Sequence, residues 1–298
     1  MKLIVGLDIG TTGCRAIIFD EAGNVHAQAR REYTINIPHP NWAEQDAELV
    51  WTLAWDTLGE AITQCKNKNN IEALSLSVQG EAIIPIDDSG KALRPAILGM
   101  DTRTVDQNLW IMNNFDPFWL FTHTGMPIHT VNTFPKILWI KQNEKELWDR
   151  TFRFVLYEDY IINKLTGQTV CSTCLASRTQ LYDLKKQQWS QEILNAIDLD
   201  PDRLSKVMPS GTPVGQMKKE LSDLLGLKIP PIVVTGGHDQ ACGALGGGLI
   251  RAGEASVSTG TAEVIEIAMD SPNLIKAIWE SNISVYYHVI PNLYLAMT

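Results

Sequence analysis

Two short turns rich in glycine and threonine carry the residue types that bind phosphate groups. The first is DIGTTGCR at residues 8–15, and the second is STGT at residues 258–261. In the first turn, two glycines favour positive φ angles and let an anion approach the backbone, while Thr11 and Thr12 add hydroxyl and amide donors. Either turn alone is also explained as a tight turn with a capping aspartate. Two such turns in one chain predict a phosphotransferase cleft.

Two aspartates belong to this predicted cleft. Asp8 stands directly before the first turn, where a bound Mg²⁺ would need a carboxylate, because this ion takes one or two carboxylates together with waters and phosphate oxygens. Asp239 lies in the segment GGHDQ at residues 236–240, at the predicted start of a helix, where N-capping is an alternative role. His238 precedes it, but neighbouring residues on a helix point in different directions, so no acid–base dyad is predicted.

The sequence around the first turn predicts three strands, a helix and a further strand. The turn joins strands at residues 3–7 and 15–19 in a hairpin, and a third strand follows within residues 1–34. Apolar residues recur every three and four positions over residues 46–66, which is typical of an amphipathic helix, and residues 71–78 form an apolar strand. Further helices are predicted over 103–113, 134–148, 158–165, 189–197 and 238–250, with strands at 82–86 and 232–235.

Composition narrows the class of protein. The chain has 298 residues, of which 45% are hydrophobic, and this is enough for a full core and for more than one domain. A net charge of −9 argues against a general nucleic-acid binder, which needs clustered Lys and Arg. The apolar run before Asp8 is too short for a signal peptide or a membrane span, so we expect a cytoplasmic protein with no membrane partner.

The cysteines do not indicate a disulfide framework. There are five, an odd number, and they are scattered along the chain, so we expect them to be reduced. Cys171 and Cys174 form one CxxC pair, but a structural zinc site of this kind needs a second pair.

The strand pattern restarts after residue 250. Strands are predicted at residues 254–258, 262–269, 285–290 and 293–297, flanking the second turn as the first turn is flanked. The remaining chain is too short to close a second core. We therefore expect a first domain over residues 1–250 and the beginning of a similar second domain over residues 251–298, in an N-terminal portion of a longer protein.

An ordered series of segments resembles the FGGY family of carbohydrate kinases, which includes xylulokinase, gluconokinase and glycerol kinase. Besides DIGTTGCR the series comprises NWAEQD at 41–46, SVQGEA at 77–82, DTR at 101–103, KILWIKQNE at 136–144, LYEDYIINKLTG at 156–167, ASRTQLYDL at 176–184 and GGHDQACGALGGG at 236–248. The resemblance implies an α/β fold with an RNase H-like domain of the actin and hexokinase type, followed by the start of a second such domain. Members of this family are longer than this chain.

The resemblance implies a role for each residue that matches a family motif. Asp239 becomes the catalytic base, and the chemistry agrees, because a carboxylate within hydrogen-bond reach accepts the proton of a sugar hydroxyl during phosphoryl transfer. Asp8 becomes a ligand of Mg²⁺, and the phosphates of ATP are bound by Thr11, Thr12 and Arg15 from the first domain and by Gly260 and Thr261 from the second.

Contacts to the acceptor are expected from Gln79, Glu81, Asp101, Arg103, Asp239 and Gln240. Gly80 and Glu81 follow Gln79 at the place where glycerol kinase has an Arg-Glu pair after its Gln and xylulokinase has a Met-His pair. Gly99 stands where both relatives place a Trp, so the pocket is wider here and glycerol is disfavoured. Glu81 accepts hydrogen bonds from sugar hydroxyls and repels a carboxylate, which disfavours gluconate.

The leading hypothesis is an ATP- and Mg²⁺-dependent kinase for a ketopentose such as xylulose. Gluconate, ribulose, a tetritol or glycerol are alternative acceptors, and a homodimer is left open. A sugar sensor without catalysis on the same actin-like scaffold is an alternative of another class. An ATPase of the Hsp70 type fits the GGHDQ and NWAEQD segments poorly. Alone, the 298-residue chain is expected to bind sugar weakly and to turn over little.

Overall fold

A mixed six-stranded sheet forms the centre of the protein. The computed structural model describes residues 1–259 and 263–298. The strands run in the order β13–β14–β5–β1–β2–β3. They are β1 (Leu3–Ile9), β2 (Gly13–Asp20), β3 (Val25–Glu32), β5 (Ile71–Val78), β13 (Pro213–Gln216) and β14 (Ile232–His238). β1, β5 and β14 are mutually parallel, whereas β2 and β3 follow β1 as an antiparallel meander. The predicted hairpin and the order of three strands, a helix and a strand are therefore confirmed.

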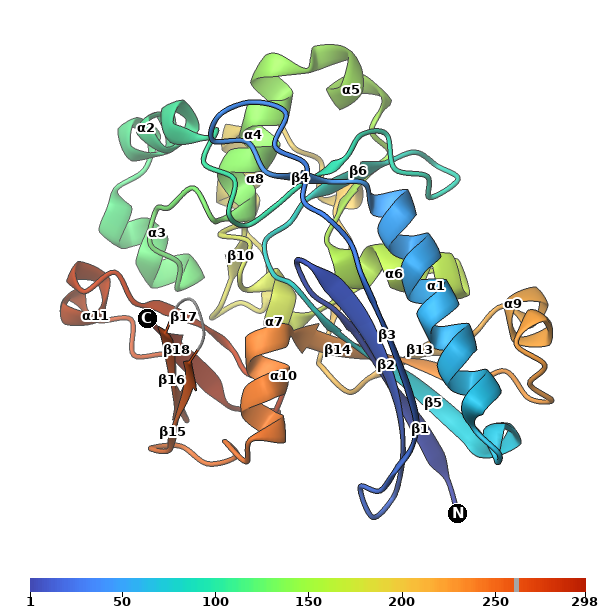
Figure 1. Cartoon of the computed structure of the whole chain (residues 1–298). Helices are drawn as coiled ribbons and strands as arrows, with labels where there is room; N and C mark the ends of the chain where they lie inside the picture. Colours follow the sequence, from blue (N-terminus) through green and yellow to red (C-terminus); the bar gives the residue numbers. More distant parts are fainter. Residues whose placement is uncertain (260–262) are drawn as a thin grey trace.

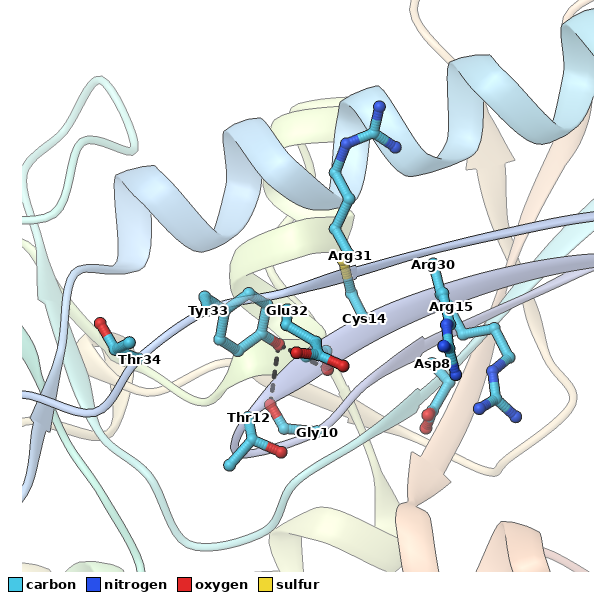
Figure 2. A pocket seen from close by; sticks show the side chains of 11 residues that line it. Asp8, Gly10, Thr12, Cys14, Arg15, Arg30, Arg31, Glu32, Tyr33 and Thr34 are labelled. Carbon is cyan, nitrogen blue, oxygen red and sulfur yellow. Dashed lines mark hydrogen bonds between the residues drawn. The ribbon is translucent and has the colours of Figure 1, made fainter.

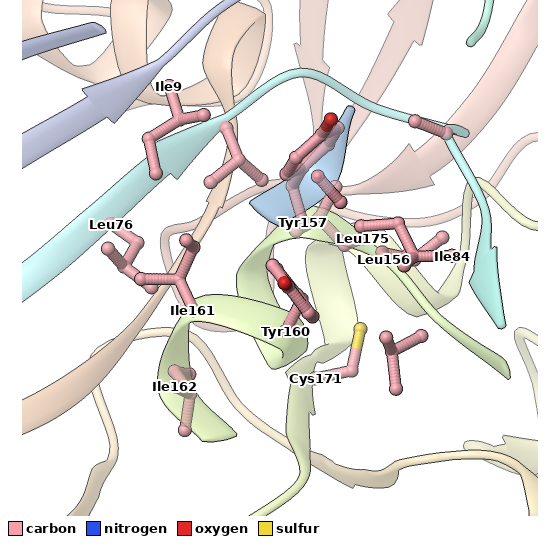
Figure 3. Close-up of a cluster of buried hydrophobic side chains, with 14 of the residues drawn as sticks. Ile9, Leu76, Ile84, Leu156, Tyr157, Tyr160, Ile161, Ile162, Cys171 and Leu175 are labelled. Carbon is pink, nitrogen blue, oxygen red and sulfur yellow. The ribbon is translucent and has the colours of Figure 1, made fainter. Parts of the chain in front are cut away.

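One face of the sheet is covered by two helices. β1 alternates between buried residues, including Leu7 and Ile9, and exposed ones such as Asp8, as expected for a strand with a single buried face. The helix α1 (Ala47–Gln64) packs on β2 and β3, and the helix α6 (Tyr157–Thr166) packs on β5 and β14. Figure 3 shows the core formed between α6 and the apolar side chains of the sheet. Asp8 therefore points to the face that these helices leave open.

The predicted long helix of residues 46–66 begins where its sequence provides a cap. The side chain of Asp46 accepts hydrogen bonds from the backbone amides of Glu48 and Leu49, at 3.0 and 3.1 Å. An N-cap of this kind stabilises a helix by about 1 kcal/mol, because it satisfies amide groups that have no partner inside the helix.

The chain between β5 and β14 adds several helices, most of which lie above the sheet in Figure 1, whereas α9 (Lys219–Leu224) lies to the right of β13. Its helices are α2 (Val105–Asn114), α3 (Pro117–Thr124), α4 (Thr133–Asn143), α5 (Lys145–Arg150), α6, α7 (Thr173–Ala176), α8 (Gln191–Ala196) and α9. Its short strands pair with one another as β6 (Ile84–Ile86) with β8 (Arg153–Val155), β9 (Val170–Ser172) with β12 (Lys206–Met208), and β10 (Tyr182–Asp183) with β11 (Gln188–Trp189). Its strand β7 (Ala96–Ile97) pairs with β4 (Glu44–Gln45), which precedes α1 in the chain.

Two predictions for this region need correction. The single helix predicted over residues 134–148 is two helices, because Glu144 leaves the helical conformation with φ −130° and ψ 60°. The sequence analysis also missed α3, although its signals are present. Asp116 caps it, Pro117 occupies its first turn, and Gly125 ends it in the left-handed conformation.

The end of the chain packs a second, smaller sheet against the helix that follows β14. This helix, α10 (Asp239–Gly246), stops four residues before the predicted end, at the run of glycines 246–248. After α10 come β15 (Ala255–Thr259), β16 (Glu263–Met269), α11 (Lys276–Glu280), β17 (Ser284–Tyr287) and β18 (Tyr294–Met297). In Figure 1, α10 lies between the second sheet and the central one.

The second sheet reproduces only part of the first. β15 and β16 form an antiparallel hairpin, as β1 and β2 do, but the strand order is β15–β16–β18–β17, so the next strand in the chain is not the next in the sheet. Tyr286 and Leu295 from this sheet are buried together with Ala241 of α10. Gly260 and Thr261, the predicted phosphate-binding residues of the second turn, lie outside the described residues.

Candidate active site

Three parallel strands bring the predicted site residues together at one edge of the sheet. Ile9 at the end of β1 pairs with Val78 at the end of β5, and Val78 pairs on its other side with His238 at the end of β14. The segments that follow are the first turn, the loop that contains Gln79 and Glu81, and the start of α10 at Asp239. Ligands of open α/β sheets bind beyond the carboxyl ends of parallel strands. The register of the sheet therefore assembles a site from segments that are up to 230 positions apart in the sequence.

The first turn owes its shape to close packing. The amide of Gly10 donates to the carbonyl of Gly13 at 2.9 Å, and the hydroxyl of Tyr33 lies 2.8 and 2.9 Å from the carbonyl oxygens of these two glycines. Neither glycine has a positive φ, so this prediction was wrong. Gly13 is required for another reason, because a Cβ atom there would lie 2.6 Å from the carbonyl oxygen of Arg31 on β3.

Side-chain amides tie the turn to the loop after β5. Gln79 donates to Oε1 of Gln45 at 2.9 Å, and Gln45 donates to the carbonyl of Thr11 at 2.8 Å. The hydroxyl of Tyr157 on α6 also donates to Oε1 of Gln45, at 2.6 Å. Buried amides whose hydrogen bonds are satisfied hold a unique geometry. Gln45, which the sequence analysis noted only as part of NWAEQD, therefore positions the turn.

The turn separates two cavities. The turn cavity, of about 640 Å³, is lined by Asp8, Gly10, Thr12, Gly13, Cys14, Arg15, Arg30, Arg31, Glu32, Tyr33 and Thr34. The strand-end cavity, of about 550 Å³, is lined by Thr11, Gln79, Gly80, Glu81, Leu98, Gly99, Met100, Thr102, His129, Thr130, Val131, His238, Asp239 and Gln240. Thr11 and Thr12 thus face different cavities, although the sequence grouped them.

Asp8 has the environment of a cation ligand. Desolvation raises the pKa of Asp8, and repulsion from Asp239 adds to this, while Ser77 and Arg15 partly offset it. Ser77 donates to Oδ1 of Asp8 at 2.8 Å. A carboxylate that faces an open cavity and is repelled by a second carboxylate fits Mg²⁺, which needs few protein ligands. Among residues 1–259 and 263–298 there is no group of three or more His, Cys, Asp or Glu side chains arranged around a metal position.

Two arginines stand beside Asp8 on the open face of the sheet. Arg15 lies directly across from Asp8 in the β1–β2 pair and directly across from Arg30 in the β2–β3 pair. Figure 2 shows these three side chains gathered at one end of the turn cavity, whereas Arg31 extends toward α1. Arg31 is bound there by Glu60 at 2.9 Å. Like charges directly opposite on two strands repel each other, so Arg15 and Arg30 favour an anion between them. The sequence analysis selected Arg15 and missed Arg30.

Asp239 begins α10 on the wall of the strand-end cavity. Its Oδ1 atom accepts a hydrogen bond from the amide of Gln240 at 2.7 Å and lies 3.3 Å from Nε2 of His238. The reason given for discounting His238 was wrong. His238 is the last residue of β14 and precedes the helix, with φ −61° and ψ 137°, so the rule for neighbours on a helix does not apply to it.

Glu81 is held by two buried cations. It has a φ of 57°, uncommon for a residue with a side chain, and is 5% exposed. Its carboxylate is paired with Arg178, and its carbonyl accepts from Lys136 at 3.1 Å. Burial raises the pKa of Glu81, but the neighbouring positive charge, that of Arg178 first, outweighs burial and holds the pKa below its usual value. Glu81 is thus a buried residue, and Arg178, which was not predicted from the sequence, neutralises its charge.

Asp101 and Arg103 lie behind the cavity wall. Arg103 forms ion pairs with Asp101 at 2.7 Å and with Glu44 at 2.9 Å, and its guanidinium stacks on Trp42, 3.7 Å from the ring centroid. Oδ2 of Asp101 accepts from the amide of Ala43 at 2.6 Å. Both side chains are buried and neither lines the strand-end cavity, unlike Gln79, Glu81, Asp239 and Gln240.

The remaining sequence predictions concern cysteines and membranes. All five cysteines carry free thiols, and Cys171 and Cys174 are buried. No helix among the described residues is both long enough and apolar enough to cross a lipid bilayer.

Comparisons with known proteins place the chain in a family. The profile of the FGGY family of carbohydrate kinases, N-terminal domain, matches residues 3–246. A xylulose kinase from Staphylococcus xylosus is 30% identical over 98% of this chain and 60% of its own length, and a gluconokinase from Bacillus subtilis is 29% identical over 90% and 52%. The solved structure of a xylulose kinase from Rhodospirillum rubrum superposes with a TM-score of 0.93 at 26% identity, covering 99% of this chain and 60% of its own. The chain thus spans at most about three fifths of these relatives, and it belongs to the FGGY family of carbohydrate kinases.

Proposed function

We propose that this chain provides the acceptor side of the active site of an ATP-dependent carbohydrate kinase. The reaction transfers the γ-phosphate of ATP to a hydroxyl group of a sugar or polyol, with a ketopentose such as xylulose as the preferred acceptor. The observation that carries the proposal is the position of Asp239. It lines one cavity, and the first turn separates that cavity from a second one that contains two facing arginines.

Asp239 acts as the general base. The acceptor lies in the strand-end cavity, where Gln79, Glu81 and Gln240 offer hydrogen-bonding groups beside it. The acceptor O–H bond breaks, its proton passes to the carboxylate of Asp239, and the oxygen attacks the γ-phosphorus. Asp101 and Arg103 act from behind this wall, because Arg103 is paired with both Asp101 and Glu44.

The turn cavity receives the phosphate groups of ATP. Thr12 and the backbone of the turn donate hydrogen bonds, and Arg15 and Arg30 supply positive charge. Asp8 would hold Mg²⁺, which when bound would supply positive charge to the phosphoryl oxygens. Gly260 and Thr261 contribute the opposing phosphate contacts.

The cavity wall favours an acceptor larger than glycerol. Gly99 leaves space beside Glu81, whose Oε2 lies 3.5 Å from the position of the missing Cβ atom, and Val131 is the next neighbour at 3.6 Å. Arg178 pairs with Oε1, so Oε2 remains to accept from a sugar hydroxyl. This pairing also weakens the repulsion of a carboxylate that Glu81 alone would exert, and gluconate therefore belongs in the substrate panel.

The test is ADP release by the natural polypeptide that carries this chain, across xylulose, ribulose, pentitols, tetritols, glycerol and gluconate. We expect one ketopentose to give the largest stimulation and Asp239→Asn to reduce it by roughly 10²–10⁴-fold, the range for a general base. Asp116→Asn is the matched control. Asp116 is exposed and caps α3, and asparagine caps equally well, so activity is retained.

Three outcomes would contradict this proposal. Sugar binding without ADP release for any acceptor of the panel would favour a sensor on the same scaffold. ADP release that no acceptor stimulates would indicate an ATPase. Equal activity of the Asp239→Asn variant and the unmodified protein would remove Asp239 as the base.

A further inference from the structure

His238 is buried and oriented against the carboxylate of Asp239. It is 5% exposed, and its Nε2 atom lies 3.3 Å from Oδ1 of Asp239. Its ring meets that of Tyr286 edge to face, with centroids 5.9 Å apart. The loop after β5 fixes the ring from another side, because a Cβ atom on Gly80 would lie 2.5 Å from Cδ2 and 2.8 Å from Nε2. Only a glycine at position 80 leaves room for this imidazole.

The chemistry of this pocket determines which ring nitrogen carries the proton. Burial lowers the pKa of His238, and the positive charge of Arg178 lowers it further, so the ring is neutral and has one N–H group. A carboxylate can only accept, so the nitrogen that faces Asp239 must be the donor. Within the described part of the chain, Nδ1 is buried and has no hydrogen-bond partner. The proton therefore belongs on Nε2.

We propose that His238 is a positioning residue for the general base: its Nε2–H group holds Oδ1 of Asp239, so that Oδ2 is the oxygen that takes the proton of the acceptor. This inference rests on the proposed function. Oδ1 already receives the amide of Gln240 at 2.7 Å, and Nε2 of His238 lies 3.3 Å from the same atom, at ion-pair distance but without an aligned hydrogen bond. Contacts of this kind are often long in the absence of substrate and tighten when the substrate binds.

The charged groups around the pair favour this arrangement. Beyond burial, Arg178 lowers the pKa of His238, whereas Asp239, Glu81 and Glu266 of β16 raise it. Asp239 in turn adds to burial in raising the pKa values of Asp8 and Cys242. Burial and, after it, the charge of Arg178 lower the pKa of His238 and keep it neutral, so His238 can donate a hydrogen bond without removing the proton affinity that a base needs. His238 keeps its proton throughout. The acceptor proton moves to Oδ2 of Asp239, the new bond forms between the acceptor oxygen and the γ-phosphorus, and the bond to ADP breaks.

Two amide substitutions test the role of Nε2 separately from that of the ring. A glutamine at position 238 can place its amide nitrogen near the position of Nε2, whereas an asparagine can reach only the position of Nδ1. In the natural polypeptide that carries this chain, we expect His238→Asn to lower kcat by roughly 30-fold, less than the ~10²–10⁴-fold expected for loss of the base itself, with the KM for sugar within about twofold. His238→Gln should keep kcat within about threefold of the unmodified protein.

Equal kcat values in the two variants would overturn the role of His238, because a merely structural residue does not distinguish amides by the atom they replace. Gly80→Ala gives a second test that retains the histidine. The new Cβ displaces the ring, so kcat should fall as in His238→Asn, and an unchanged kcat would also overturn the proposal. Asp239→Asn distinguishes failure of the proposed function from failure of the role of His238 alone. If Asp239→Asn is fully active, the proposed function and the role of His238 both fail, whereas Asp239-dependent activity with equal amide variants removes only the role of His238.

Discussion

The carboxylate of Glu158 on α6 binds the backbone of the strand that carries the candidate base. Its Oε1 atom accepts from the amide of Gly236 on β14 at 2.6 Å, and its Oε2 atom accepts from the amide of Ser172 at 2.6 Å. The side chain is fully buried, and burial raises its pKa above the usual value. The contact stands where β5 and β14 lose their regular register, between Val234 and Gly237. Glu158 thus replaces strand pairing at the point where β14 turns toward the site.

Glu158→Gln should therefore destabilise the protein. Glutamine has one acceptor oxygen, so its NH₂ group must face one of the two backbone amides, and that amide loses its partner. We expect a loss of about 1–3 kcal/mol in the free energy of unfolding, the cost of one unsatisfied buried group. Denaturant unfolding followed by tryptophan fluorescence measures it. Glu146→Gln, an exposed substitution on α5, is the control, and equal stability of the two variants would contradict the prediction.

Replacement by alanine should strongly destabilise the protein at one glycine of the site and have almost no effect at another. A Cβ atom on Gly236 would lie 1.6 Å from the carbonyl oxygen of Leu76, which no side-chain rotation relieves. Gly236→Ala should cost more than about 4 kcal/mol, since β5 and β14 must separate. At Gly99 the nearest atom would be 3.5 Å away, an ordinary contact, so Gly99→Ala should change stability by less than about 0.5 kcal/mol. The soluble yield and Tm of both variants decide this, and a well-folded Gly236→Ala protein would contradict it.

The sequence predicted the regular elements well where local signals and burial agree. β5 spans the predicted residues 71–78, and α1 spans Ala47–Gln64 within the predicted range 46–66. The helix break at Glu144 was missed because no glycine or proline marks it, and only the dihedral angles of that residue reveal it.

The site was predicted less completely, because its contacts join distant segments. Arg178 and Glu81 are 97 positions apart, and nothing near either residue indicates the pair. Arg30 lies beside Arg15 only through the β2–β3 register. His238 could have been found from the sequence, since a residue before a helix is not bound by the geometry of helix neighbours.

Lys136 should make stability depend on pH. It is fully buried and donates to the carbonyl groups of Glu81 and Val131, and burial lowers its pKa to about 7, although Glu81 and Asp101 partly oppose this. The unfolded chain has the ordinary lysine pKa near 10.5. Between these values the unfolded state binds the additional proton, so this group makes stability rise with pH from about 7 to 10.5, and its stabilising effect is lost as pH falls to about 7.

Lys136→Met should remove this rise. The difference in unfolding free energy between the unmodified protein and Lys136→Met should grow from pH 7 to pH 9, by up to about 1.4 kcal/mol per pH unit. Denaturant unfolding at pH 7, 8 and 9 measures the difference, which also cancels the titration of other groups. Lys145→Met, on the exposed surface of α5, should show no such trend. A difference that does not change with pH would contradict the predicted protonation of Lys136.

Arg30 should strengthen ATP binding at a small cost to the stability of the free protein. Arg30 lies directly across from Arg15 in the β2–β3 register, and Asp8 lies across from Arg15 on the other side. Arg30→Gln removes the repulsion and should raise the free energy of unfolding by about 0.2–1 kcal/mol, the scale of a cross-strand pair. It also removes one charge-assisted contact to phosphate, so the KM for ATP should rise by roughly 10-fold, equivalent to about 1.4 kcal/mol, and the KM for sugar should stay the same.

Arg31→Gln is the matched control, because it changes the neighbouring arginine to the same residue. Arg31 is turned away to Glu60 on α1, at 2.9 Å, so its loss should leave the KM for ATP unchanged. Steady-state kinetics at low and at high salt add a second criterion. The effect of Arg30→Gln should shrink as salt screens the charges, whereas a lost structural contact would persist. Equal ATP affinities in the Arg30 and Arg31 variants would show that the open face of β2 and β3 does not bind the phosphates.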